Sequence, residues 1–404
     1  MSNPYAEIFK VPGARRFSAA GFIARLPLSM ITLGIVTMLS QARGEYWLAG
    51  AVSATFAFSN ALIAPQISRV VDRYGQRRVI LPASAISVMG LIALMLATRY
   101  EAPVWTLFLF ALLGGFMPSI AAMVRARWSE IYRNTPKLHT AFAFESVVDE
   151  VIFMTGPIIA IGLSVGLFPE AGPLAATVLL AFGTVLFAAQ RSTEPPIHSQ
   201  EASGGSSVIR LPVLQIVALT LVAVGAIFGT AEVTAIAFSE EQGFKAAASI
   251  VLASYAAGSL IVGLIFGTLK LKMPLAMQFL LAIALATLTT LPLLIVNGIP
   301  VLAIVLFFAG AAISPTIIIS MGLIERGVPQ SKLTEGITWV MTGIGIGMAV
   351  GSSASGWVID EFGARNGFLV SIAAGFLALV IAAAGYRILA AKRAGSLHSA
   401  VPAE

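Results

Sequence analysis

Long apolar stretches alternate with short polar ones along the whole chain. Each apolar stretch has about 20 residues or more, the length that an α-helix needs to cross the hydrocarbon core of a bilayer. The pattern therefore predicts an all-α membrane protein with twelve transmembrane helices, over residues 17–41, 46–71, 79–98, 103–127, 139–166, 171–189, 211–238, 246–269, 273–296, 299–324, 335–359 and 366–390.

Residues 190–210 form a long polar interruption that is rich in Pro, Ser, Gly and charge. This composition is typical of a flexible linker. We therefore expect two six-helix bundles, residues 1–189 and 211–404, joined by a cytoplasmic linker. Two short matches between a span and the sixth span after it also favour related halves: Pro118-Ser119-Ile120 with Pro315-Thr316-Ile317, and Met154-Thr155-Gly156 with Met341-Thr342-Gly343.

The composition agrees with this pattern, since 58% of the residues are hydrophobic and only 11% are charged. A soluble domain has about 25% charged residues. The chain has no cysteine, which excludes disulfides and thiol chemistry. Its three histidines, His139, His198 and His398, fall at segment ends or in loops. With no metal-ligand cluster, nucleophile triad or nucleotide-binding loop, we expect neither an enzyme nor a cofactor or metal.

The basic residues predict the orientation of the chain. Most of the 25 Lys and Arg residues fall on the side of the N-terminus, and Arg43, Arg99, Lys245 and Arg365 fall on the other. Positive loops stay in the cytoplasm, so both termini are expected to be cytoplasmic in a multi-pass protein of the inner cell membrane. The charge thus reflects topology and not a nucleic-acid surface. The first span is too long for a cleaved signal, and we expect a monomer that contacts lipids.

Three acidic residues lie in the predicted fifth span: Glu145, Asp149 and Glu150. A charged carboxylate at the bilayer centre costs roughly 2.5–3.5 kcal/mol or more, so such residues usually face a protein interior or a water-filled cavity. At about 100° per residue, Glu145 and Asp149 share one helix face and Glu150 points elsewhere. Gly156-Pro157 then interrupts the backbone hydrogen bonding and favours a kink.

Arg25 in the first span lies at a depth comparable with Glu145 and Asp149, and Glu232 is a further acid in the seventh span. Three hypotheses follow. Asp149 and Glu150 exchange a proton as a central cavity opens to either side, with Arg25 and Glu145 modulating the exchange. Alternatively, Glu145 and Asp149 only neutralise Arg25 and Arg125 as structural pairs. The third hypothesis is that the acids bind a cationic substrate without proton coupling.

The loop after the second span, residues 68–78, reads SRVVDRYGQRR. It resembles the signature loop of the major facilitator superfamily, Gly-x-Leu-x-Asp-Arg-x-Gly-Arg-Lys/Arg-Arg, with Ser68 in place of the first glycine. The matching residues are Asp72, Arg73, Gly75, Arg77 and Arg78. The resemblance implies two bundles around a central site, alternating access, and a loop that ties the halves together at the cytoplasmic side. Alternatively, this loop serves only topology.

Gly156-Pro157 resembles the Gly-Pro helix of proton-driven exporters in this superfamily, although the surrounding glycines are absent and Arg125 falls near the inner end of the fourth span. The resemblance implies proton-coupled export of small amphipathic compounds by a drug/proton antiporter-type transporter. The alternatives are proton-coupled uptake of a small metabolite and a membrane sensor or scaffold that transports nothing.

Overall fold

The computed structural model describes residues 3–44, 46–197, 207–244, 247–269 and 271–390. His198, Lys245 and His398 lie outside these ranges. Within the ranges, every regular element is a helix. Ten of the helical segments are long and apolar enough to cross a membrane, and two shorter apolar helices, Val104–Gly114 and Ile250–Phe266, fall in the predicted fourth and eighth spans.

The first half of the chain packs around α2, which contacts α3, α7 and α8, while α4 packs on α5 and α8. The helices of this half are α1 (Pro4–Ile8), α2 (Ala14–Arg43), α3 (Tyr46–Tyr74), α4 (Gln76–Arg99), α5 (Val104–Gly114), α6 (Ile120–Tyr132), α7 (Pro136–Gly166) and α8 (Ala171–Ala189).

The second half packs around α9, which contacts α14 and α15, while α10 packs on α12 and α11 on α15. Two short 3-10 helices, η1 (Arg191–Thr193) and η3 (Val208–Arg210), lie between the halves in sequence. The helices of the second half are α9 (Pro212–Glu241), α10 (Ala247–Phe266), α11 (Leu275–Thr290), η4 (Leu291–Ile295), α12 (Ile299–Ala311), α13 (Ile313–Gly327), η5 (Gln330–Lys332), α14 (Leu333–Phe362) and α15 (Ala364–Ala390).

Each predicted span coincides with one helix or with a consecutive pair of helices, but the fourth is interrupted. Residues 115–119 separate α5 from α6 and contain Pro118, which cannot donate a backbone hydrogen bond. The side chain of Asn60 compensates by donating to the carbonyls of Gly115 at 3.1 Å and Met117 at 2.9 Å. This amide therefore satisfies backbone groups that the interruption leaves free.

The glycine-rich part of α14 lies directly on α9. A Cβ atom at Gly347 or Gly351 would collide with the backbone carbonyl of Val222 or Ala226 in α9. Residues without side chains at this spacing allow two helices to approach closely, as is common in membrane proteins. The stretch is helical throughout, so it has no loop in which a phosphate could be cradled.

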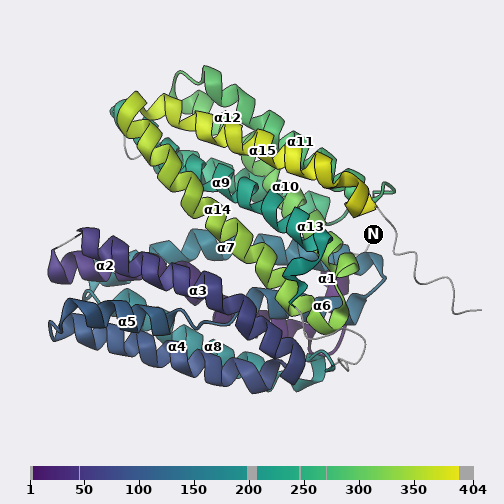
Figure 1. Ribbon diagram of the computed structural model, residues 1–404, viewed down its shortest axis with the longest axis horizontal. Coiled ribbons are helices and arrows are strands. Elements are labelled where there is room, and N and C mark those ends of the chain that lie inside the picture. Colours follow the sequence, from purple (N-terminus) through teal and green to yellow (C-terminus); the bar gives the residue numbers. More distant parts are fainter. Residues whose placement is uncertain (1–2, 45, 198–206, 245–246, 270, 391–404) are drawn as a thin grey trace, which may run out of the picture.

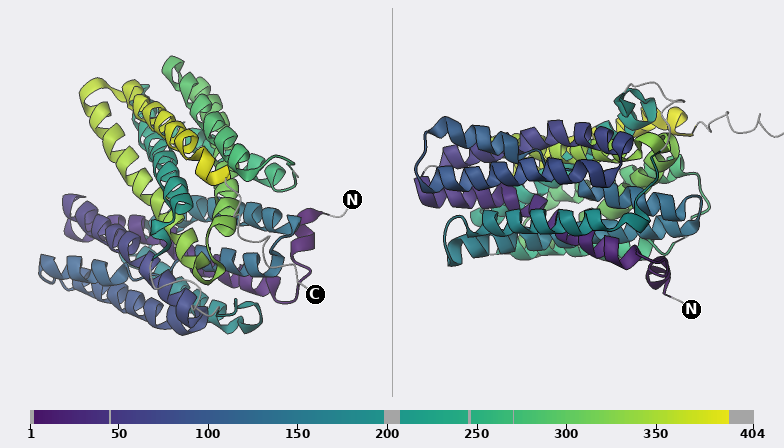
Figure 2. Two further views of the ribbon diagram at one scale, coloured as in Figure 1. Left: turned by 45° about the vertical axis from the view of Figure 1, so that its right-hand side comes forward. Right: turned by 90° about the horizontal axis from the view of Figure 1, so that it is seen from below.

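The two halves converge at the end of the molecule that carries the loop of residues 72–78, which we call the motif end. In Figure 1 and in the left view of Figure 2, the helices of the first half (purple and blue) and those of the second half (green and yellow) spread apart toward the opposite end. The contacts between the halves run from α3 and α6 to α14, and from α7 to α10 and α13. Helix α7 therefore lies between the halves.

Candidate functional site

One side of α7 forms a network of buried charges with α2. The guanidinium of Arg25 pairs with Glu145 at 2.6 Å and with Asp149 at 3.0 Å. Arg25 also donates through Nε to the carbonyl of Gly21 at 3.2 Å, which fixes its orientation along α2. Because Glu145 and Asp149 are four residues apart in one helix, a single guanidinium reaches both.

Helix α6 completes the network from the other side. Arg125 pairs with the second oxygen of Asp149 at 2.6 Å, and the indole N–H of Trp128 donates to Glu145 at 2.6 Å. Arg125 and Glu145 are fully buried, while the side chain of Asp149 keeps 23% of its surface exposed. Two arginines and two acids therefore balance one another, which offsets the large cost of taking each charge out of water.

Glu150 points to the other half of the molecule. Its carboxylate accepts a hydrogen bond from Ser259 of α10 at 3.3 Å, and Ser259 in turn bonds Ser314 of α13 at 3.0 Å. Both serines are almost fully buried. Glu150 makes no ion pair within the part of the chain that the structure describes, in contrast to the residue before it.

Glu232 of α9 and Tyr255 of α10 lie close enough to Glu150 to interact with it electrostatically. Tyr255 is 3% exposed and its hydroxyl has no hydrogen-bond partner among the described residues. Its ring meets that of Phe228 edge to face, with the centroids 5.2 Å apart. We call Glu150, Glu232, Tyr255, Ser259 and Ser314 the second polar cluster. The hydrogen bond from Ser259 to Glu150 joins the halves there, and no basic residue of the described ranges forms an ion pair with Glu150.

The Gly156-Pro157 pair lies where α7 crosses α2. A side chain at position 156 would collide with the hydroxyl of Ser29, and that hydroxyl donates to the carbonyl of Ile152 at 3.0 Å. The helix continues through Pro157 to Gly166. Glycine here permits the close approach of α2 and α7, about two turns beyond Asp149 and Glu150.

Asp72 holds the two halves together at the motif end. Its carboxylate accepts the backbone N–H groups of Thr334 at 3.2 Å and Glu335 at 2.8 Å, at the start of α14. A carboxylate at this position satisfies free N–H groups and complements the positive end of the helix dipole. Close by, the hydroxyls of Ser68 and Thr338 are 2.8 Å apart.

The rest of the loop motif supports this contact. Gly75 has a φ of +90°, which favours glycine, and it forms the one-residue connection between α3 and α4. The backbone N–H of Arg77 donates to Glu194 at 2.9 Å. Arg73 lies over the ring of Tyr74, with 5.2 Å between the guanidinium carbon and the ring centroid, and the side chains of Arg73, Arg77 and Arg78 are exposed.

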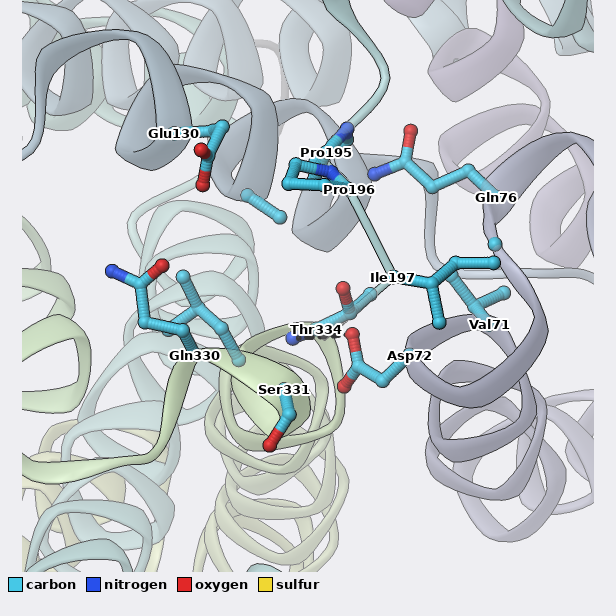
Figure 3. A pocket seen from close by; sticks show the side chains of 13 residues that line it. Val71, Asp72, Gln76, Glu130, Pro195, Pro196, Ile197, Gln330, Ser331 and Thr334 are labelled. Carbon is cyan, nitrogen blue, oxygen red and sulfur yellow. Dashed lines mark hydrogen bonds between the residues drawn. The ribbon is translucent and has the colours of Figure 1, made fainter. Parts of the chain in front are cut away.

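A small cavity remains where these parts meet, and Figure 3 shows that Asp72 and Thr334 border it together with Glu130, Gln330 and the Pro195-Pro196 pair. Its volume of about 30 Å³ has room for one or two water molecules. The halves are therefore closely packed at the motif end.

The segment between the halves is fastened at both of its ends. Arg127, which is fully buried, donates to the carbonyl of Gln190 at 2.7 Å and to the hydroxyl of Thr193 at 2.9 Å. On the other side, Glu335 of α14 accepts the hydroxyl of Ser207 and the backbone N–H of Val208, the latter at 3.2 Å. Each end is thus attached to its own half.

A family model of the Major Facilitator Superfamily matches residues 17–300 and 246–400 of the chain. The chain belongs to this superfamily. It is therefore a multi-pass membrane protein of a transporter family. No match was found among curated proteins.

Solved structures of superfamily members have the same fold. The chain is similar to a bacterial homologue of the iron transporter ferroportin in an outward-facing state, with a TM-score of 0.73, 14% identity, and coverage of 94% of this chain and 99% of that one. It is similar to the transporter FucP in an outward conformation, with a TM-score of 0.71, 13% identity and coverage of 95% and 99%. For the human organic anion transporter MFSD10 (TETRAN), the TM-score is 0.70, the identity 14% and the coverage 92% and 100%.

Sequence reasoning missed several members of these sites. The pairing of Asp149 with Arg125, one of the alternatives that the sequence leaves open, is present at 2.6 Å, whereas three hydroxyl residues are not among the sequence candidates. Tyr255, Ser259 and Ser314 could not be singled out as site residues from the sequence. Serines in apolar helices commonly bond the backbone of their own helix. No group of three or more His, Asp or Glu within the described ranges could hold a metal ion.

Proposed function

We propose that this protein is a secondary active transporter that works by alternating access. In this proposal the chain has twelve spans in two bundles, residues 1–189 and 211–404, and works as a monomer in the inner membrane. The excess of basic residues at the motif end supports a cytoplasmic location for that end and for both termini. The structure then corresponds to a state closed toward the cytoplasm.

We further propose that transport is coupled to protons and that Glu150 binds the proton. The observation that carries this proposal is that Glu150 lies between the halves next to Ser259 of the opposite half, with no ion pair to any residue that the structure describes. Burial without a basic partner disfavours the charged form of a carboxyl group in general. A proton carrier needs this property, because it must gain and lose its proton as its surroundings change.

Asp149 has a different role in this proposal. Two guanidinium groups contact its carboxylate, so its charge is already compensated in the closed state. It orients α7 so that the next residue, Glu150, faces α10. Glu232 shares the electrostatic surroundings of Glu150 and is the second acid whose charge state changes with the proton.

The proposed direction is export, and the proposed substrates are small amphipathic compounds. Within the described ranges neither Glu150 nor Glu232 forms an ion pair with a basic residue, which suits an apolar compound with a positive group better than an anion. One proton that crosses 100 mV supplies about 2.3 kcal/mol, which sustains roughly a forty-fold gradient of substrate. Proton-coupled uptake of a metabolite is the second candidate, because an unpaired Glu150 would serve a symporter equally well.

The test measures accumulation of a fluorescent amphiphilic cation, ethidium, in cells that lack their own efflux pumps. Empty vector, wild type, Glu150→Gln and Asp149→Asn are compared at equal protein level, each with and without a protonophore. We expect lower accumulation with wild type, loss of this difference in Glu150→Gln, and a reduced but protonophore-sensitive difference in Asp149→Asn.

Other outcomes separate the alternatives. Full protonophore-sensitive export by Glu150→Gln would refute the proton-site assignment. Higher accumulation with wild type than with vector would support uptake. If no compound in a chemically diverse panel moves in either direction in proteoliposomes under an imposed pH gradient, the transport proposal fails and a sensor or scaffold becomes the better explanation.

A further inference from the structure

Side chains of the first half surround the carboxyl end of α10, which belongs to the second half. The hydroxyl of Tyr5 donates to the carbonyl of Leu264 at 2.6 Å. The Nε2 atom of His139 lies 2.9 Å from the carbonyl oxygen of Phe266. Thr140 donates to the carbonyl of Gly267 at 2.9 Å.

Leu264 and Phe266 are in the last turn of α10, and Gly267 directly follows the helix; the carbonyl of Phe266 also accepts the backbone N–H of Leu269 at 3.1 Å. An α-helix leaves the last four C=O groups without intrahelical donors, and α10 ends at Phe266. Water cannot easily supply the bonds to Phe266 and Gly267, because the side chains of Thr140 and Phe266 are at least nine-tenths buried, whereas the bond from Tyr5 to Leu264 lies at the surface. Burial raises the pKa of Tyr5 to about 12, so its hydroxyl remains a neutral donor throughout the physiological range.

The contact is tightly packed as well as hydrogen-bonded. The ring centroids of His139 and Phe266 lie 5.2 Å apart. A Cβ atom at Gly267 would collide with the Tyr5 hydroxyl and with the methyl group of Ala143. Glycine at the end of α10 therefore allows the first half to approach the helix end from two directions.

This contact is the structural counterpart of the Asp72 contact. If each span is related to the sixth span after it, α3 corresponds to α10 and α14 to α7. In the first pair, the end of α3 meets the start of α14, and a carboxylate on α3 accepts N–H groups of α14. In the second pair, the end of α10 meets the start of α7, but here side chains of α7 donate to carbonyls of α10. The places correspond, while donor and acceptor are exchanged.

We propose that Tyr5, His139 and Thr140 form a second latch that holds the motif end closed, independently of the loop motif. The proposal rests on the alternating access proposed above, since all three hydrogen bonds must break when the halves separate at this end. The short helix α1 thereby acquires a role in transport, because it carries Tyr5 across to the opposite half. Removing these donors shifts the conformational equilibrium toward the state open at the motif end.

The test uses the absence of cysteine from the chain. Spin labels on Arg16→Cys and Lys272→Cys, two exposed positions outside the latch, report the separation of the halves at the motif end. Distances are measured by pulsed electron paramagnetic resonance on purified protein without substrate. In the Tyr5→Phe/Thr140→Val variant, we expect the population with the longer distance to rise at least three-fold.

Thr155→Val is the matched control, because Thr155 lies in the same helix as Thr140 and, among the described residues, its hydroxyl bonds the backbone of its own helix, at Val151. It should leave the distances unchanged. A distance distribution of Tyr5→Phe/Thr140→Val that superimposes on wild type would overturn the proposal. His139→Phe tests the third donor and keeps an aromatic ring against Phe266. Tyr5→Phe and Thr140→Val change the side-chain shape very little, so the test remains valid even if His139→Phe misfolds.

The readout separates this proposal from the proposed transport function. It requires neither a substrate nor a proton gradient, so a shift in the latch variant remains informative if no transported compound is found. Asp72→Ala serves as a comparator for the other latch. If Asp72→Ala opens the motif end and Tyr5→Phe/Thr140→Val does not, only the loop motif holds it closed and the second latch is refuted.

Discussion

Two neighbouring residues of α7, Asp149 and Glu150, have opposite surroundings. Asp149 faces the first half and contacts two guanidinium groups, at 3.0 and 2.6 Å. Glu150 faces the second half, where a serine is its nearest polar partner, at 3.3 Å. The helix turns by about 100° between them, and this rotation separates a compensated charge from an uncompensated one. The comparison shows that the depth of an acid in a membrane helix does not determine which partners surround it.

The largest expected loss of stability comes from breaking an ion pair on the Asp149 side of α7. Arg25→Gln leaves Glu145 buried without a cation, and removal of one partner of a buried ion pair lowers the free energy of unfolding by about 3–5 kcal/mol. Unfolding in mixed micelles by increasing SDS measures this change. Glu150→Gln is the control, because it breaks no ion pair and should unfold like wild type. Equal stability of both variants would mean that the two sides of α7 do not differ.

A double variant sharpens the same point. Arg25→Leu/Glu145→Leu removes both members of one pair and leaves Asp149 with Arg125. Replacing both partners of a buried pair by apolar residues is often neutral or stabilising by about 1–4 kcal/mol. We therefore expect the double variant to regain most of the stability that Arg25→Leu alone loses in the same SDS titration. Additive losses would show that the pair does not act as a unit.

Asp149→Asn should have a smaller effect on stability than Arg25→Gln. The amide oxygen still accepts from one arginine, and Arg25 keeps Glu145, so the loss corresponds to one poorly satisfied buried group, about 1–3 kcal/mol. The SDS titration measures it beside Glu150→Gln. A stability equal to wild type would mean that Asp149 contributes nothing to the free energy of unfolding and that the Arg25–Glu145 pair alone stabilises the network.

Asp72 is a third kind of acid, which is compensated by backbone N–H groups and not by side chains. Asp72→Ala removes both acceptors from the start of α14, and loss of such a cap costs about 0.5–2 kcal/mol. This should favour opening of the motif end by two-fold to thirty-fold, as measured by the Arg16→Cys and Lys272→Cys spin labels. An unchanged distance distribution would show that the contact does not contribute to closure.

The smallest expected effect is on the uncompensated side. Tyr255→Phe removes a buried hydroxyl that has no partner among the described residues. Because an unsatisfied buried polar group costs about 1–3 kcal/mol, its removal should leave the free energy of unfolding unchanged or raise it slightly. A clear loss of stability in the SDS titration would show that this hydroxyl has a hydrogen-bond partner. The polar groups around Glu150 would then be better satisfied than we propose.

Much of the helix pattern could be predicted from the sequence, because apolar length and the turn of 100° per residue are local properties. They place Glu145 and Asp149 on one face, as the structure has them, and Glu150 on another. The sequence offers the pairing of the acids with Arg25 and Arg125 as one hypothesis, but it could not show that both guanidinium groups reach the carboxylate of Asp149. Residue counting ignores helix tilt and the interruption at residues 115–119. The close packing at the motif end could not be predicted either, because it depends on contacts between residues far apart in the sequence, such as Asp72 with Thr334 and Glu335.

The two fastened ends of the connecting segment have a consequence for how the gene can be divided. Residues 190–193 stay with the first half through Arg127, and residues 207–208 stay with the second half through Glu335. A break in the coding sequence between codons 197 and 207 would leave each fragment with its own anchored terminus. Two co-expressed fragments should then assemble into one transporter.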